Sequence, residues 1–139
     1  MALWKDSNNK IHDDMNGKAL ALPTWPQGMT QITQADATAI LNPAPTPAQI
    51  FTQAESSVQS MLDTFAQTWQ YESILSAASY ATSTVLKFQH EASALIAWRD
   101  QVWSACYAAM AAIQAGTQAM PVNIAAFVAT LPVAPARPL

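Results

Sequence analysis

Residues 88–115, FQHEASALIAWRDQVWSACYAAMAAIQA, decide the fold of this chain. Their larger apolar side chains mostly follow one another at steps of three, four or seven, the spacing that collects side chains on one face of an α-helix. Those side chains are Phe88, Leu95, Trp98, Val102, Trp103, Tyr107, Met110 and Ile113. The polar residues expected largely on the opposite side are Glu91, Arg99, Asp100 and Gln114. Gly116 follows, and glycine readily takes the left-handed conformation that ends a helix. At about 1.5 Å per residue the helix is roughly 40 Å long, so another element must cover its apolar face.

The segment that begins at Thr46 is the natural partner of this helix. Thr46 is a capping residue, Pro47 suits the first helical position, and the Gln49 side chain reaches back to the cap. The helix that follows has apolar residues at steps of three and four, which predicts one apolar face made of Ile50, Ala54, Val58, Met61, Phe65 and Trp69. Two antiparallel helices with such faces pack at about +20°, as in a bundle or coiled coil.

Shorter elements complete this helical body. The Ser-, Ala- and Thr-rich residues 73–82 predict a short helix, with a bend at residues 83–84. Residues 121–131 predict a last short helix with Ile124, Phe127 and Val128 as its apolar residues. Residues 132–139 are proline-rich, and we expect them to be extended.

The first part of the chain has a different pattern. Residues 2–5 and 10–12 are short strand candidates around a turn at residues 6–9, and residues 29–32 suit a third strand. We expect Trp4 and Ile11 to face a small core. Trp25 lies between two prolines, which predicts a loop with an anchored aromatic residue. Thr33 then begins a helix over residues 35–41, with Asp36 completing a capping box.

The fold class predicted is therefore mainly α, of the α+β type. Residues 1–45 form a small module with a β-hairpin, a short helix and a Pro-rich linker. Residues 46–131 form the helical body, an antiparallel helical hairpin or bundle, and residues 132–139 form the extended tail.

The charge of the chain narrows its partners. Charged residues make up 11% of the 139 residues, against roughly 25% in average soluble proteins. A weakly charged surface repels its neighbours poorly, which favours a homo-oligomer or a larger assembly over the alternative, a monomer with a plain polar surface. The net charge of −3 and the lack of a basic run argue against a nucleic-acid partner.

A membrane partner is not expected either. The longest apolar run, residues 102–113, is too short to span a bilayer. The opening residues MALWKDSNNK lack the apolar core of a signal peptide, so we expect a soluble protein made in the cytoplasm.

Catalytic and metal-binding patterns are weak. His12, Asp13 and Asp14 are adjacent, and neighbouring residues on a strand point to opposite sides, so a solvated turn is the better interpretation. Residues 6–8 begin like a calcium loop, but Lys10 and Ile11 stand where such a loop needs a ligand and a glycine. The chain has three glycines and no glycine-rich phosphate loop. We therefore expect no enzyme activity, no cofactor and no metal.

Two further residues with reactive side chains have plain interpretations. Cys106 lies among apolar residues of the 88–115 helix, which predicts a small buried hydrophobe rather than a nucleophile. His90 has no second histidine in metal-binding register, so it is expected at the surface.

The aromatic residues suggest a docking surface. Trp98, Trp103 and Tyr107 cannot all lie on one narrow helix face. The helix is either buried on two sides, or one aromatic edge is exposed for docking. Trp98 is the first candidate because Arg99 and Asp100 beside it are polar, and Trp103, Trp4 and Trp25 are further candidates for partner binding.

Several short segments of the sequence are similar to sequences of one protein family. LWKDSN at 3–8 with KIHD at 10–13, WPQGMTQITQADA at 25–37, AWRDQVW at 97–103, QAG at 114–116 and AFVATLP at 126–132 resemble small tail-fibre-associated and tail fibre assembly proteins of tailed bacteriophages. The resemblance spans nearly the full chain in the same order. The end of the chain departs from it, since such proteins often finish with tryptophan and proline after Leu-Pro, whereas VAPAR follows here.

The resemblance implies a protein without catalysis that binds a phage tail fibre or another tail protein. Two roles are open. In one, the protein is a structural accessory or adaptor that stays in the virion tail. In the other, it is a chaperone that binds fibre chains during morphogenesis and is then released.

Overall fold

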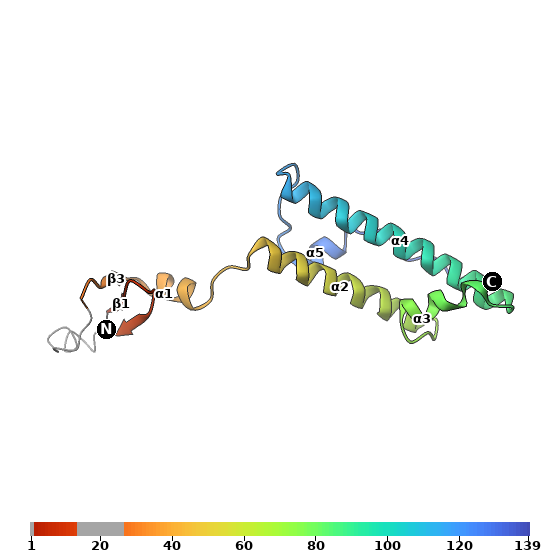
Figure 1. Ribbon diagram of the computed structural model, residues 1–139, viewed down its shortest axis with the longest axis horizontal. Helices are drawn as coiled ribbons and strands as arrows, with labels where there is room; N and C mark the ends of the chain where they lie inside the picture. The colour runs from red at the N-terminus through yellow and green to blue at the C-terminus, as the bar shows by residue number, and fades with distance from the viewer. Residues whose placement is uncertain (1, 14–26) are drawn as a thin grey trace. The chain divides into compact units, whose positions relative to one another are not determined.

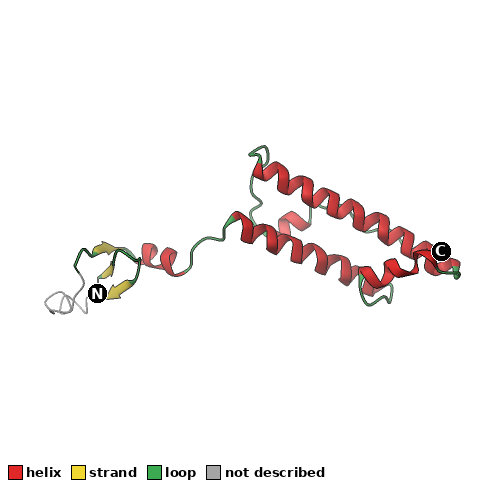
Figure 2. Ribbon diagram, viewed as in Figure 1, coloured by secondary structure: helices red, strands yellow, loops and turns green. Residues whose placement is uncertain are grey.

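A computed structural model describes residues 2–13 and 27–139. The chain divides into two compact units, Met1–Pro45 and Thr46–Leu139. The protein is mainly helical, with one small antiparallel sheet near the N-terminus and a long helical hairpin (Figure 2), which confirms the predicted fold class.

The first unit contains a three-stranded antiparallel sheet. Its strands are β1 Leu3–Lys5, β2 Ile11–Asp13 and β3 Thr30–Ile32, in the order β2-β1-β3. The Asp6 carboxylate closes the turn between β1 and β2 by accepting the backbone N–H groups of Asn8 at 2.8 Å and Lys10 at 2.9 Å. Asn9 has φ 61°, a left-handed conformation that asparagine tolerates in turns. The predicted hairpin and its third strand are confirmed.

The register of this sheet separates Trp4 from Ile11. Trp4 lies opposite His12, whereas Ile11 lies opposite Lys5. Residues that lie opposite one another share a face, and successive residues alternate between faces, so Trp4 and Ile11 point to opposite sides of the sheet. The prediction that both face one core is wrong, because the turn chemistry sets a register that strand composition does not show.

Helix α1, Gln34–Leu41, follows β3 and begins with the predicted capping box. The Thr33 hydroxyl accepts the Asp36 N–H at 3.1 Å, and the Asp36 carboxylate accepts the Thr33 N–H at 3.0 Å. Ala37 is the buried residue of this helix. The predicted loop around Trp25 lies outside the described residues.

Two long antiparallel helices form the frame of the second unit (Figure 1). Helix α2, Pro47–Thr68, begins with a capping box in which Thr46 N–H donates to Gln49 Oε1 at 2.8 Å. Helix α4, Leu86–Gln114, ends as predicted at Gly116, whose φ is +76°. The N–H groups of Gly116 and Thr117 donate to the last free carbonyls of α4, which is the usual pattern for a glycine-terminated helix.

Short helices connect and cover the long ones. Helix α3, Ile74–Ala78, continues into a 3-10 helix, Ser79–Thr82, and Ser83 returns to an extended conformation before α4. Helix α5, Ile124–Val128, packs on α2 and buries Phe127. Residues 132–139 carry no helix or strand.

The core of this unit lies between α2, α4 and the short helices. Its members are Ala54, Val58, Leu62, Ala66, Trp69, Tyr71, Ile74, Ala77, Leu95, Trp98, Val102, Cys106, Phe127 and Leu131. On α2 the most buried line runs through Leu62 and Ala66, whereas Met61 and Phe65, which were predicted on that line, are only partly buried. The buried face of α2 is therefore turned about the helix axis by one residue, about 100°, relative to the predicted face. Where apolar residues are adjacent in the sequence, the pattern does not determine which of them faces the core.

Candidate functional site

The second unit has a groove of about 860 Å³, lined by α2, by Trp98 of α4 and by the chain from Val128 onward. We call it the apolar groove. None of the described residues that line it is charged. They are Ser56, Ser57, Ser60, Met61, Thr64, Phe65, Thr68, Trp98, Val128, Ala129, Leu131, Pro132, Val133 and Ala134.

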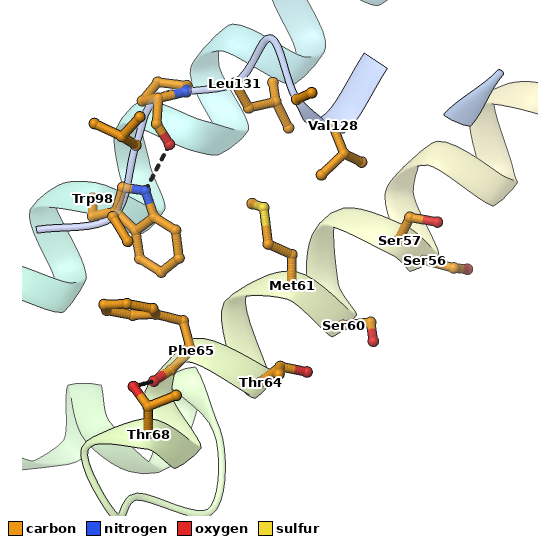
Figure 3. Close-up of a pocket in the computed structure, with 14 residues that line it drawn as sticks. Ser56, Ser57, Ser60, Met61, Thr64, Phe65, Thr68, Trp98, Val128 and Leu131 are labelled. Carbon is orange, nitrogen blue, oxygen red and sulfur yellow. Dashed lines mark hydrogen bonds between the residues drawn. The ribbon is translucent and has the colours of Figure 1, made fainter. Parts of the chain in front are cut away.

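Large side chains form the floor of the apolar groove. Figure 3 shows Met61 and Phe65 of α2 and Trp98 of α4 pointing into the same space, below Val128 and Leu131. The Phe65 and Trp98 rings meet edge to face with centroids 4.8 Å apart. Trp98 Nε1 donates to the Pro132 carbonyl at 2.9 Å, which fixes the indole and joins the C-terminal segment to α4. These contacts hold the side chains of the floor in place.

Small hydroxyl side chains form the α2 side of the apolar groove. Ser56, Ser60 and Thr64 are exposed, and they follow one another along α2 at steps of four (Figure 3). Thr68 differs, because its hydroxyl donates to the Phe65 carbonyl at 2.6 Å. The hydroxyls at the other positions are available as hydrogen-bond partners for a segment in the groove.

A second groove of about 690 Å³ lies on the other side of this line of hydroxyls. We call it the polar groove. Its described lining residues come from two helices: Glu55, Ser56, Gln59, Ser60, Asp63, Thr64 and Gln67 from α2, and Trp103 and Tyr107 from α4. The Trp103 and Tyr107 rings are stacked, with centroids 5.5 Å apart and planes at 24°. Tyr107 is 54% exposed, so this aromatic pair offers an accessible face.

The structure places the predicted docking residues differently from one another. Trp98 is 4% exposed and belongs to the core, so the prediction that it forms an exposed edge is wrong. It shares the buried face of α4 with Leu95 and Val102, and its polar neighbours Arg99 and Asp100 pair with each other at 2.9 Å.

The other three candidates have separate positions. Trp103 is half-buried and lines the polar groove beside the more exposed Tyr107. Trp4 is half-buried in the sheet of the first unit. Trp25 lies outside the described residues. The structure therefore brings Trp98 and Trp103 to two grooves of one unit, and Tyr107 is the exposed aromatic residue of the polar groove.

A buried ion pair is the feature that sequence reasoning missed. Glu91 is 1% exposed, although its position in the helical pattern predicted the polar side. Its carboxylate accepts the Tyr71 hydroxyl at 2.7 Å and Arg137 Nε at 2.7 Å. Arg137 also donates to the Trp69 carbonyl at 3.2 Å and lies 5.8 Å from the centroid of the Trp69 ring. The sequence held one signal for this ion pair: Arg137 is the only charged residue after Asp100.

These contacts set the protonation of the cluster. The hydrogen bond from Arg137 holds the pKa of the Glu91 carboxyl below its usual range, and the Tyr71 hydrogen bond acts in the same direction. Burial, followed by the hydrogen bond to Glu91, raises the pKa of Tyr71 to about 12. Glu91 is thus a buried carboxylate whose charge is matched by Arg137, which ties the C-terminal segment to α4.

The cysteine and the described histidines lie in surroundings that do not indicate a catalytic or metal site. Cys106 is fully buried, and burial raises the pKa of its thiol. His12 lies 3.2 Å from the Asp6 carboxylate that closes the β1–β2 turn, and His90 is exposed as predicted. Across residues 2–13 and 27–139, no three His, Cys, Asp or Glu side chains are grouped to hold a metal ion. No described helix is long and apolar enough to cross a bilayer.

Comparison of the chain with protein-family models, with curated proteins and with solved structures finds no match.

Proposed function

We propose that this protein is a non-enzymatic bacteriophage tail-fibre-associated protein, a structural accessory that binds a segment of the tail fibre and stays in the virion. The apolar groove is the observation that carries the binding role. The identity of the partner and the location in the virion tail rest on the resemblance of the sequence segments to tail-fibre-associated proteins.

The chemistry of the apolar groove suits a segment of another protein. Its floor offers two rings and a methionine, which give large contact area, and methionine adapts to irregular partners. Its rim offers hydroxyls that can bond to the backbone of an incoming segment. Because none of the described lining residues is charged, a charged side chain would lose its hydration there without gaining a counter-ion. The groove therefore favours an uncharged, mainly apolar segment.

The alternative role, a chaperone released after fibre assembly, is favoured by a different observation. Val122 and Val133 are 93% and 90% exposed, and Val133 also lines the apolar groove. Apolar side chains that stay accessible in the single chain are suited to a transient hold on apolar fibre segments before those segments pack.

The binding role is tested by placing a charge in the apolar groove. Met61→Glu introduces a carboxylate on the floor, and Gln53→Glu places the same charge on an exposed position of α2 outside both grooves. We expect Met61→Glu to weaken binding of the purified tail fibre by at least about tenfold, which corresponds to roughly 1.4 kcal/mol. Gln53→Glu should bind as the unaltered protein does. Equal binding by all three proteins, with unchanged helical content, would exclude the apolar groove as the binding site.

The two roles are separated by quantifying the protein in purified particles. A fixed ratio to the fibre in the virion supports the structural accessory. Absence from particles, together with higher yields of soluble fibre on co-expression, supports the chaperone.

A further inference from the structure

We propose that the polar groove is a docking site for an arginine or lysine side chain, carried by the same partner segment that occupies the apolar groove. The presence of a partner segment rests on the proposed function. The preference for a cation rests on the polar groove itself and is tested separately below.

The polar groove combines an aromatic face with carboxylates. The stacked pair Trp103 and Tyr107 forms one wall, and Glu55 and Asp63 stand on the α2 wall. A guanidinium or ammonium group is attracted to the face of an aromatic ring, and a carboxylate within reach strengthens the attraction. Because the protein carries a net charge of −3 as well, an anionic side chain is disfavoured at this place.

The two carboxylates differ in availability. Asp63 is held in place, since its Oδ1 accepts the Ile74 N–H at 2.9 Å and its Oδ2 accepts Gln59 Nε2 at 3.1 Å. Glu55 is half-buried, and its carboxylate forms no hydrogen bond or ion pair with any residue the structure describes. Glu55 is therefore the carboxylate that a partner's cation would meet first.

No basic residue among those that the structure describes already fills this role. Lys and Arg are absent from the described residues that line the polar groove. Arg99 precedes Trp103 by one turn of α4, but its guanidinium binds Asp100 through Nε at 3.1 Å and Nη2 at 2.9 Å. The aromatic and acidic walls are thus left for a cation from outside.

The same unit shows how it holds an arginine. Arg137 bonds to the Glu91 carboxylate at 2.7 Å and lies 5.8 Å from the centroid of the Trp69 ring. That cluster joins a carboxylate and an indole around one guanidinium. The polar groove presents the same two chemical groups, Glu55 and the Trp103–Tyr107 pair, without an arginine of its own.

The apolar groove and the polar groove adjoin, so we assign both to a single partner segment. Both grooves are lined by Ser56, Ser60 and Thr64, so a segment that crosses this line of small side chains enters both. The partner segment then has uncharged apolar side chains for Met61, Phe65 and Trp98, followed by one basic side chain for Glu55 and Tyr107.

The cation preference is tested on the full chain with N-acetyl-arginine amide as the probe, followed through the indole N–H signal of Trp103 in NMR spectra. We expect a saturable shift with a Kd on the order of 10 mM, typical of one cation–π contact with one ion pair. Glu55→Gln should weaken the Kd by about threefold or more, and Tyr107→Ala should abolish the saturable shift. Glu72→Gln, an exposed glutamate outside the groove, is the matched charge control and should change nothing.

Three outcomes would overturn the proposal: no saturable shift, an equal response to N-acetyl-glutamate amide, or unchanged binding by Glu55→Gln. The occupant is tested with the fibre, whose binding should weaken about threefold or more in Glu55→Gln and fall with added salt. Probe binding without any fibre binding would reject the proposed function and leave the cation site standing. Fibre binding that Glu55→Gln and salt leave unchanged would reject the shared occupant.

Discussion

Replacing Tyr71 by Phe tests the buried cluster with the loss of a single oxygen atom. The Tyr71 hydroxyl donates to Glu91 Oε2 at 2.7 Å, and Glu91 is 1% exposed. In Tyr71→Phe the ring keeps its packing, including its contact with Tyr80 at 5.5 Å between centroids. The carboxylate loses one donor, and water has little access to replace it.

The size of the effect follows from the charge of the acceptor. A hydrogen bond to a charged group contributes about 1.5–3 kcal/mol, more than a bond between neutral groups. Taking about 2 kcal/mol, a unit of this size should unfold at a temperature roughly 8 to 16 °C lower. The remaining bond from Arg137 to Glu91 keeps the loss below that of an unpaired buried charge.

The effect should depend on pH in one direction. The folded-state pKa of Glu91 lies below its ordinary value of 4.5, first through the Arg137 hydrogen bond and also through the Tyr71 hydrogen bond. The stability that the Glu91 carboxylate contributes is therefore fully present above pH 4.5 and is lost as the pH falls through the folded pKa. The difference between Tyr71→Phe and the unaltered protein should be largest at neutral pH and should narrow in acid.

Thermal and urea unfolding followed by circular dichroism at neutral pH and in acid measure both effects. Tyr80→Phe is the matched control, because Tyr80 is 40% exposed and its hydroxyl makes no hydrogen bond with the described residues. We expect Tyr80→Phe to stay within about 0.5 kcal/mol of the unaltered protein. Equal stability of the two variants at neutral pH would refute the argument that Glu91 is a buried, ionised carboxylate.

Three more predictions concern other parts of the structure. Leu62→Ala should lower the free energy of unfolding by about 2–5 kcal/mol because Leu62 is fully buried, whereas Leu75→Ala, at a position 74% exposed, should change it by less than about 0.5 kcal/mol; urea titration compares them. Gly116→Ala should lower the free energy of unfolding, measured by thermal unfolding, by about 1–2 kcal/mol. An added methyl group meets nothing within 4 Å, so the loss comes from the backbone alone, whose φ is +76°, and unchanged stability would contradict this reasoning. The Cys106 thiol should react with a disulfide reagent on the order of 100-fold more slowly in the native protein than in urea, and rapid native labelling would contradict its burial.

The starts of α1 and α2 and the end of α4 were readable in the sequence. Thr46 and Gln49 form their capping box as the pattern predicts, and so do Thr33 and Asp36. Gly116 ends α4 in the left-handed conformation. Each of these features depends on residues a few positions apart in the sequence, so all its hydrogen-bonding groups come from one short segment.

The side chains that meet across the fold were decided by the tertiary structure. The β1–β2 register put Trp4 and Ile11 on opposite faces. The packing of α2 against its neighbours buried Leu62 more deeply than Met61, which left Met61 on the floor of the apolar groove. The C-terminal segment covered Trp98 through the carbonyl of Pro132.

The sequence by itself therefore determined the fold class, the two long helices, the start of α2 and the end of α4, because periodicity and capping are local properties of the chain. Only the tertiary structure decided that Glu91 is buried and that Trp103 and Tyr107, rather than Trp98, present an accessible aromatic face in the polar groove. The physical reason is that a buried carboxylate is stable only beside its counter-ion. For Glu91 that counter-ion is Arg137, 46 residues away, and no helical pattern connects the two.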